Sequence, residues 1–234
     1  MTASFSGAPI SARILQIRKT LPPTVRLIAV TKQVSAEAVR AAYMAGVRDF
    51  GESRIQEAIA KQAELADLTD ITWHFIGHLQ TNKVQQALTH FDWIHSVDSL
   101  KLAKRLNHLA AELPHPPHCC LQVKIVPDPP KYGFDIDDLW QALPQLDQCT
   151  ALKIVGLMTI PPYGRETAEL QMIFQQAREL ASAINQRGFS HIQMQQLSMG
   201  MSADYPIAIA AGATLIRLGS TIFGARPNAL PQQV

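Results

Sequence analysis

Apolar and polar residues follow two alternating patterns along most of the chain. Short apolar runs rich in β-branched residues, such as residues 25–30, are typical of strands that are buried on both faces. Between these runs lie longer segments in which apolar residues recur every three or four positions, as in amphipathic helices. The connections are short, and no sequence typical of a β-hairpin interrupts the alternation. The pattern therefore predicts parallel strands that are each followed by a helix.

The predicted elements favour a closed barrel. Eight strands are predicted, at residues 25–32, 47–50, 71–77, 93–97, 119–126, 152–160, 191–197 and 214–218. Helices are predicted between them at 35–44, 53–66, 80–88, 99–112, 136–146, 167–187 and 203–211, and a further helix at 10–19, after Ser6 or Ser11, precedes the first strand. Eight alternating units favour an α/β fold of the (β/α)8 TIM-barrel type, with an extra N-terminal helix, over an open doubly wound sheet. No glycine-rich dinucleotide-binding motif follows the first strand.

Composition limits the class of protein further. With 47% hydrophobic and 17% charged residues, the 234-residue chain can bury one large core, and we expect residues 1–234 to form a single domain with its core at about 25–226. A net charge of +2 with scattered basic residues argues against nucleic-acid binding. None of the three cysteines has metal-ligand spacing, and we expect no metal site. With neither a signal peptide nor an apolar run that could span a membrane, we expect a cytoplasmic protein, which we also expect to be monomeric.

Lys32 is the first candidate for chemistry. It is the last residue of the first predicted strand and shares a face with Ile28 and Val30. If that face points into the barrel, the amine lies at the barrel mouth, where active sites of this fold gather. A lysine that forms a Schiff base needs such a position, although a lysine after a strand is more often a solvated surface group.

Two loops at the end of the chain have the composition of an anion site. Ser198 to Ser202 follows the seventh predicted strand, and Gly219, Ser220 and a threonine follow the eighth. Small residues let the backbone approach a phosphate, although each loop could also be a simple capped turn. Because a barrel closes its eighth strand against its first, these loops are expected beside Lys32. A phosphate anchor next to an amine predicts a site for pyridoxal 5'-phosphate (PLP).

Two further side chains are candidates for contact with the cofactor ring. Arg217 lies two residues before Gly219 and so shares its face. A guanidinium at the pyridine nitrogen would keep that nitrogen unprotonated and weaken the ring as an electron sink, whereas a salt bridge at the rim is the alternative. His74 lies inside the third predicted strand, where cofactor contact and a core histidine with a satisfied hydrogen bond both stay open.

These residues also occur in a recognisable family pattern. Residues 30–32 (VTK), 50–52 (FGE), 73–83 (WHFIGHLQTNK), 131–134 (KYGF), 156–159 (GLMT), 197–204 (LSMGMSAD) and 217–224 (RLGSTIFG) resemble the PLP homeostasis protein family. The resemblance implies a barrel similar to the N-terminal domain of alanine racemase, with PLP as a Schiff base on Lys32. Ser53 stands where the family usually has asparagine, so a water is expected between Ser53 and the cofactor, and His78 stands where proline is common. The expected cofactor-binding set is Lys32, Ser53, His74, Met158, Ser198, Ser202, Arg217, Gly219 and Ser220.

Three functions are compatible with these features. The first is a PLP carrier or sensor without robust turnover, which the resemblance links to PLP homeostasis and to amino-acid and keto-acid balance, with amino acids as further partners that form external Schiff bases. The second is an amino-acid racemase of the alanine racemase type, which needs an added β-domain that we do not expect, because few residues follow the eighth predicted strand. The third is a cofactor-free aldolase, which needs a carboxylate near the lysine as acid or base. Glu52 is the only candidate at a strand end near the first strand, because Asp98 lies farther round the barrel.

Overall fold

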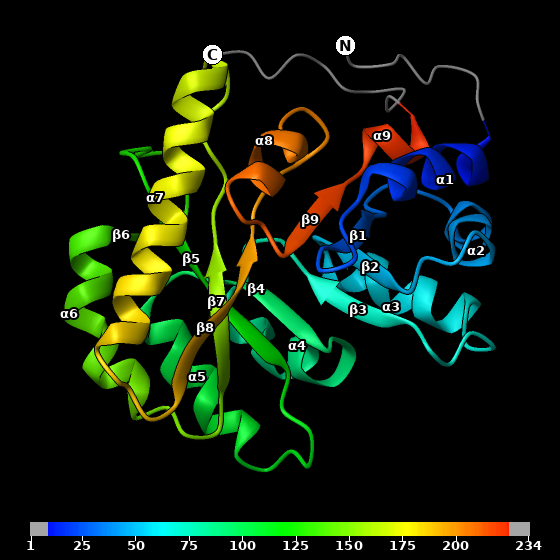
Figure 1. Cartoon of the computed structure of the whole chain (residues 1–234). Coiled ribbons are helices and arrows are strands. Elements are labelled where there is room, and N and C mark those ends of the chain that lie inside the picture. The colour runs from blue at the N-terminus through cyan, green and yellow to red at the C-terminus, as the bar shows by residue number, and fades with distance from the viewer. Residues whose placement is uncertain (1–8, 225–234) are drawn as a thin grey trace.

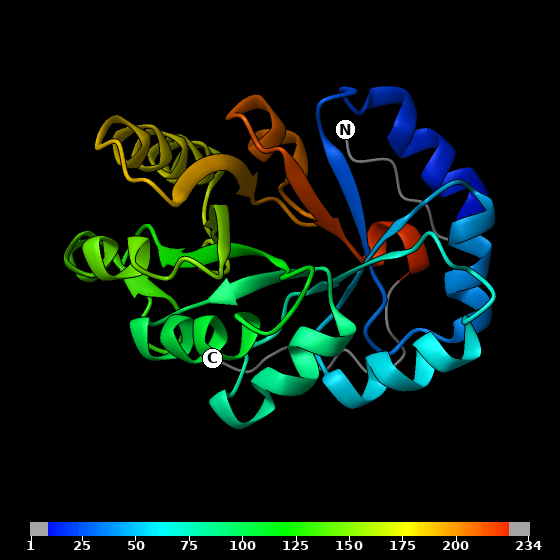
Figure 2. The same cartoon turned by 90° about the horizontal axis from the view of Figure 1, so that it is seen from below.

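The fold is a barrel of parallel strands surrounded by helices (Figures 1 and 2). The computed structural model describes residues 9–224, so Ser6 and the end of the predicted core lie outside the described residues. The strands are β1 (Arg26–Val30), β2 (Asp49–Glu52), β3 (Thr72–Phe75), β4 (Trp93–Val97), β5 (His118–Lys124), β6 (Phe134–Asp135), β7 (Lys153–Met158), β8 (Ile192–Ser198) and β9 (Leu215–Leu218). All but β6 form a ring in which β9 pairs with β1 and β4 with β5, so the barrel is closed. The predicted (β/α)8 barrel is confirmed.

All helices but the last surround the ring of strands, which Figure 2 shows from below. The helices are α1 (Ile10–Thr20), α2 (Ala36–Met44), α3 (Ile55–Glu64), the 3-10 turn η1 (Thr81–Lys83), α4 (Val84–His90), α5 (Leu100–Ala110), α6 (Ile136–Asp147), α7 (Thr167–Gln186), α8 (Tyr205–Ala210) and α9 (Ser220–Phe223). The extra N-terminal helix is confirmed as α1. Its N-cap is Pro9 rather than Ser11, which lies inside the first turn.

Local sequence accounts for where several helices begin and end. The hydroxyl of Ser35 accepts a hydrogen bond from the Ala38 N–H, and the hydroxyl of Ser99 accepts one from the Leu102 N–H, so each serine caps its helix. After α2 the chain turns at Gly46 with φ +90°, a conformation in which glycine is favoured. These caps satisfy helix-end backbone groups that would otherwise lack partners.

Two elements depart from the prediction. The two-residue strand β6 pairs with the end of β5, outside the ring, because the connection after β5 folds back along it. The segment after β9 forms the short helix α9, and the Arg13 guanidinium donates a hydrogen bond to the Ile222 carbonyl (2.9 Å), which joins α1 to α9. Figure 1 shows these two helices side by side. Of the helices in residues 9–224, none is long and apolar enough to cross a membrane.

The core has two layers. The larger one lies between the ring and the helices. The smaller one, here called the inner layer, lies inside the ring and consists of Ile28, Trp93, Cys120, Met158 and Leu215. Because Ile28 faces inward and side chains alternate along a strand, the same face of the chain continues through Val30 to Lys32. The barrel interior therefore leads to the lysine that follows β1.

Candidate functional site

Lys32 lies at the carboxyl end of β1, and its side chain is half-buried. The pairing of Ala29 with Leu218 brings the following residues, Val30 and Gly219, next to each other. A Cβ atom built on Gly219 would lie 3.6 Å from both the Cβ and the carbonyl oxygen of Val30. The ends of β1 and β9 are thus direct neighbours, as the closed barrel predicts.

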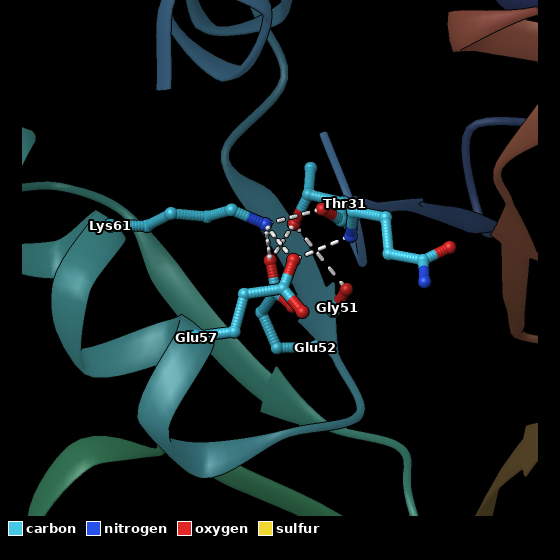
Figure 3. Close-up of polar contacts among 6 residues, drawn as sticks. Thr31, Gly51, Glu52, Glu57 and Lys61 are labelled. Carbon is cyan, nitrogen blue, oxygen red and sulfur yellow. Dashed lines mark hydrogen bonds and ion pairs between the residues drawn. The ribbon is translucent and has the colours of Figure 1, made fainter. Parts of the chain in front are cut away.

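A largely buried cluster of charged groups, formed by Glu52, Glu57 and Lys61, contacts Thr31 and Gln33, the residues on either side of Lys32 in the chain (Figure 3). Lys61 reaches from α3, and its ammonium contacts Glu52 Oε1 and Glu57 Oε1, each at 2.7 Å, and donates to the Thr31 carbonyl. The Thr31 hydroxyl donates to the same oxygen of Glu52 (2.6 Å). Burial raises the pKa of Glu52 more than the hydrogen bonds from Lys61 and Thr31 lower it. The other carboxylate oxygen of Glu52 is buried without a hydrogen-bond partner.

This cluster holds the backbone on both sides of Lys32. Thr31, which precedes it, is bonded through its carbonyl to Lys61. Gln33, which follows it, donates its backbone N–H to Glu57 and has φ +59°, which few residues other than glycine adopt. Burial alone would raise the pKa of Glu57, but the bonds from Lys61 and Gln33 outweigh burial and lower it. Sequence reasoning missed Lys61 and Glu57, whose i, i+4 spacing is also that of an ordinary pair on a helix surface.

The two predicted anion loops meet at one point. Ser202 Oγ, after β8, accepts hydrogen bonds from the N–H groups of Gly219 and Thr221, each at 3.3 Å, after β9. Two backbone donors therefore converge on one oxygen, a donor arrangement that suits a phosphate oxygen. Ser220 between them is exposed and is the first residue of α9.

The shape of the loop after β8 depends on Gly200. This residue has φ +92°, and a Cβ atom built on it would lie 2.7 Å from the Ala208 side chain. Its carbonyl accepts the N–H of Arg217 (2.9 Å), which ties the loop to β9. Asp204 fixes the other end of the loop by accepting the Met201 N–H at 2.6 Å. Burial raises the pKa of this aspartate.

Arg217 lies inside the barrel below these loops and is 4% exposed. Its guanidinium donates to the Ser198 hydroxyl (2.7 Å) and to the Thr159 carbonyl (3.1 Å), both neutral oxygens. Burial lowers the pKa of Arg217 to about 10, so the group stays charged at neutral pH. A guanidinium has five N–H groups, which leaves donors for a further acceptor such as a ring nitrogen.

His74 lies deeper in the barrel and is fully buried. Its Nδ1 contacts His95 Nε2 and its Nε2 contacts Asp49 Oδ1, each at 2.9 Å. With both ring nitrogens engaged, the arrangement favours a core histidine with satisfied hydrogen bonds over direct polar contact with a cofactor. Sequence reasoning missed His95, although its spacing of two from Trp93 places both on one face of β4.

The remaining predicted residues lie on two sides of the barrel mouth. Met158 belongs to the inner layer and pairs with Ser198 across β7 and β8. Ser53 follows β2 and is half-buried at a cavity of about 440 Å³ that His78 and Lys83 also line. The structure thus brings Lys32 between the loop of Ser53 on one side and the loops of Ser202, Gly219 and Ser220 on the other, with Met158, Ser198 and Arg217 inside the barrel.

The comparisons with known proteins agree with this architecture. Residues 7–227 match the family "Alanine racemase, N-terminal domain". A pyridoxal phosphate homeostasis protein from Synechocystis sp. is 51% identical over 211 residues, which cover 90% of this chain and 96% of that protein. The structure of PipY from Synechococcus elongatus with PLP bound is 53% identical, with a TM-score of 0.88 over 92% of this chain and 100% of that chain.

More distant structures share the fold alone. An alanine racemase from Clostridium difficile has a TM-score of 0.75 at 13% identity, over 94% of this chain and 57% of that one. Fold and site together define a barrel protein of the alanine racemase N-terminal-domain class. Within that class, the chain belongs to the family of pyridoxal phosphate homeostasis proteins.

Proposed function

We propose that this protein binds PLP covalently through Lys32 and serves in intracellular PLP homeostasis. One observation carries the proposal: the amine-bearing end of β1 adjoins two backbone N–H groups that converge on a single oxygen, with a buried guanidinium inside the same barrel. An amine, an anion site and a ring-nitrogen donor are the three features that PLP requires. The PLP-bound PipY structure, 53% identical to this chain, supports it.

Each functional group of PLP has a candidate partner among the residues of the site. The N–H groups of Gly219 and Thr221, with the Ser202 hydroxyl, would hold the phosphate. Arg217 would donate to the ring nitrogen, and Lys32 would bond to the aldehyde carbon. When bound, PLP supplies an aldehyde that condenses with amines. The chain itself supplies the anchors and the orientation.

The proposed role is that of a carrier or sensor rather than of an enzyme. A charged guanidinium at the ring nitrogen keeps that nitrogen unprotonated, which weakens the electron withdrawal on which amino-acid chemistry depends. The homeostasis-protein relatives reach 51% identity, whereas the likeness to alanine racemase at 13% identity is one of fold. We propose that amino acids can exchange with Lys32, and that the protein acts as a cytoplasmic monomer.

The absorbance spectrum of the purified protein, followed by borohydride reduction and peptide mapping, tests the cofactor site. We expect a yellow protein whose reduced adduct maps to Lys32. Lys32→Ala should abolish the adduct, whereas the control variants Lys83→Ala and Lys131→Ala should keep it. An adduct on Lys83 or Lys131, or an unchanged spectrum in Lys32→Ala, would overturn the proposal.

A second measurement separates the carrier from a racemase. The PLP-loaded protein is incubated with L-alanine in deuterated water, and deuterium at the α-carbon and the D-isomer are followed with time. We expect negligible exchange. Exchange at about 1 to 10³ per second, the usual enzymatic range, would support the racemase instead.

A further inference from the structure

A line of hydrogen bonds runs through the barrel interior from Arg217 toward the opposite end of the barrel. Arg217 Nη1 donates to Ser198 Oγ at 2.7 Å, and Ser198 Oγ lies 2.7 Å from His95 Nδ1. His95 Nε2 lies 2.9 Å from His74 Nδ1, and His74 Nε2 lies 2.9 Å from Asp49 Oδ1. These five residues, here called the interior chain, come from the strands β9, β8, β4, β3 and β2.

The amino-terminal ends of the strands anchor the far end of the interior chain. Asp49 is the first residue of β2 and forms an ion pair with Arg26, the first residue of β1. Burial alone would raise the pKa of Asp49, but His74 and Arg26 outweigh burial and lower it, so the carboxylate is ionised at neutral pH. The interior chain thus joins a fixed anion at one end of the barrel to a fixed cation near the other.

The fixed ends determine the direction of every hydrogen bond between them. An ionised Asp49 only accepts, so His74 carries its hydrogen on Nε2. Burial lowers the pKa of both His74 and His95, which are therefore neutral at neutral pH and carry one hydrogen each. His74 Nδ1 must then accept from His95 Nε2, and His95 Nδ1 must accept the hydroxyl hydrogen of Ser198.

The consequence for Ser198 concerns the cofactor site directly. Because its hydrogen is committed to His95, the lone pairs of Ser198 Oγ face Arg217, which can only donate. Without an acceptor at position 95, the buried hydroxyl hydrogen would lack a partner, and Ser198 could rotate toward another acceptor, which would move its oxygen away from the guanidinium. His95 therefore decides whether Ser198 can anchor Arg217.

We propose that Asp49, His74 and His95 are positioning residues, which act through Ser198 to hold the Arg217 guanidinium toward the cofactor's ring nitrogen. The inference rests on the proposed function, because it assigns Arg217 to that nitrogen. The competing interpretation is that the two histidines only satisfy each other's buried nitrogens and stabilise the core. That role would affect folding stability but not the environment of the ring nitrogen.

Substitutions at His95 test the proposal. His95→Leu removes the acceptor for Ser198, whereas His95→Gln can preserve the direction of both bonds, with its oxygen facing Ser198 and its amide NH₂ facing His74. The control is His118→Leu, because His118 stacks on the Trp93 ring at 4.6 Å without belonging to the interior chain. Each variant is loaded with PLP labelled with ¹⁵N in the ring. The dissociation constant, the ring ¹⁵N chemical shift and the thermal stability of the apoprotein are then measured.

We expect His95→Leu to weaken PLP binding about tenfold, the loss of one hydrogen bond to a charged group, and to shift the ring ¹⁵N signal. His95→Gln should restore most of both, and His118→Leu should leave both at the wild-type values. Unchanged affinity and an unchanged ¹⁵N signal in folded His95→Leu would overturn the proposal. A wild-type protein that does not bind PLP would instead refute the proposed function.

A measurement on the unmodified protein keeps the proposal testable if His95→Leu does not fold. Nitrogen-15 NMR of the histidine rings should find the hydrogen on Nε2 and none on Nδ1 in both His74 and His95 at pH 7. A hydrogen on Nδ1 of His95 would leave Ser198 without its acceptor and would overturn the proposal, whether or not PLP binds.

Discussion

The charged cluster at Lys32 allows a quantitative prediction for Lys61→Met. Methionine keeps the apolar stem of Lys61, which is 6% exposed, and removes only the ammonium. Glu57 is partly exposed and can regain water, but the Glu52 side chain is completely buried and loses its cation. Removal of one partner from a buried ion pair typically costs about 3–5 kcal/mol, because the other charge stays in the protein interior.

Glu52 can limit this cost by taking up a proton. Protonation of a carboxylate with the usual pKa of 4.5 costs about 1.4 kcal/mol for each pH unit above that value. The cost for Glu52 is therefore about 3.4 kcal/mol at pH 7 and about 1.4 kcal/mol at pH 5.5. We therefore expect Lys61→Met to lower the free energy of unfolding by about 3 kcal/mol at pH 7 and to recover about 2 kcal/mol of this at pH 5.5. The sign follows because Lys61 lowers the pKa of Glu52 and burial raises it, so loss of Lys61 leaves burial less opposed and raises this pKa further in the folded variant. A group with a raised pKa in the folded state loses stability as pH rises and regains it as pH falls.

Urea denaturation of the apoprotein at both pH values measures the effect. The matched control is Arg40→Met, because the Arg40–Asp67 pair has a similar distance, 2.6 Å, but lies at the surface. An exposed pair should contribute less than about 1 kcal/mol. The double variant Lys61→Met/Glu52→Gln should restore most of the lost stability. If Lys61→Met costs no more than Arg40→Met, or if its cost is the same at both pH values, the reasoning about Glu52 is wrong.

Three further predictions concern the loops and the sheet. Ser202→Ala should weaken PLP binding about tenfold, because it removes the hydroxyl that we propose to bind the phosphate, while the thermal stability of the apoprotein stays within a few degrees of wild type. Gly200→Ala should lower the free energy of unfolding by about 2–4 kcal/mol in urea, because alanine is strained at φ +92° and its Cβ would overlap Ala208. Thr214→Val should cost about 1–2 kcal/mol in the same assay, because the hydroxyl bonds both the Leu197 N–H (2.8 Å) and Gln196 Oε1 (2.9 Å). A Thr214→Val variant as stable as wild type would mean that water replaces these bonds.

Much of the fold could be predicted because strand and helix periods are local properties of the sequence. All eight ring strands were predictable from apolar runs, and the helix before them from the helical spacing of its apolar residues. The strand β6 and the helix α9 were not, because two and four residues are too few to give a periodic pattern. Their existence depends on the neighbours that β5 and α1 provide.

Part of the candidate site could also be predicted from the sequence, and part could not. Lys32 and the two loops of small residues stand at strand ends, and the closure of the barrel alone brings them together. The partners of His74 could not be predicted, because they depend on which strand lies beside β3 and on where in that strand the next inward polar residue falls. Lys61 was missed for a related reason: its spacing from Glu57 does not distinguish an exposed helix pair from one that reaches under the neighbouring strand.

The bond between Arg13 and the Ile222 carbonyl joins residues 209 positions apart, and β1 pairs with β9 at a similar separation. Contacts this distant in sequence require closure of a loop that contains nearly the whole chain, so they are expected late in folding. Lys32 follows the first strand, and the groups expected to hold the phosphate follow the last two. The cofactor therefore meets its complete set of ligands only after the first and last strands have joined, and its capture reports the final step of folding rather than an early intermediate.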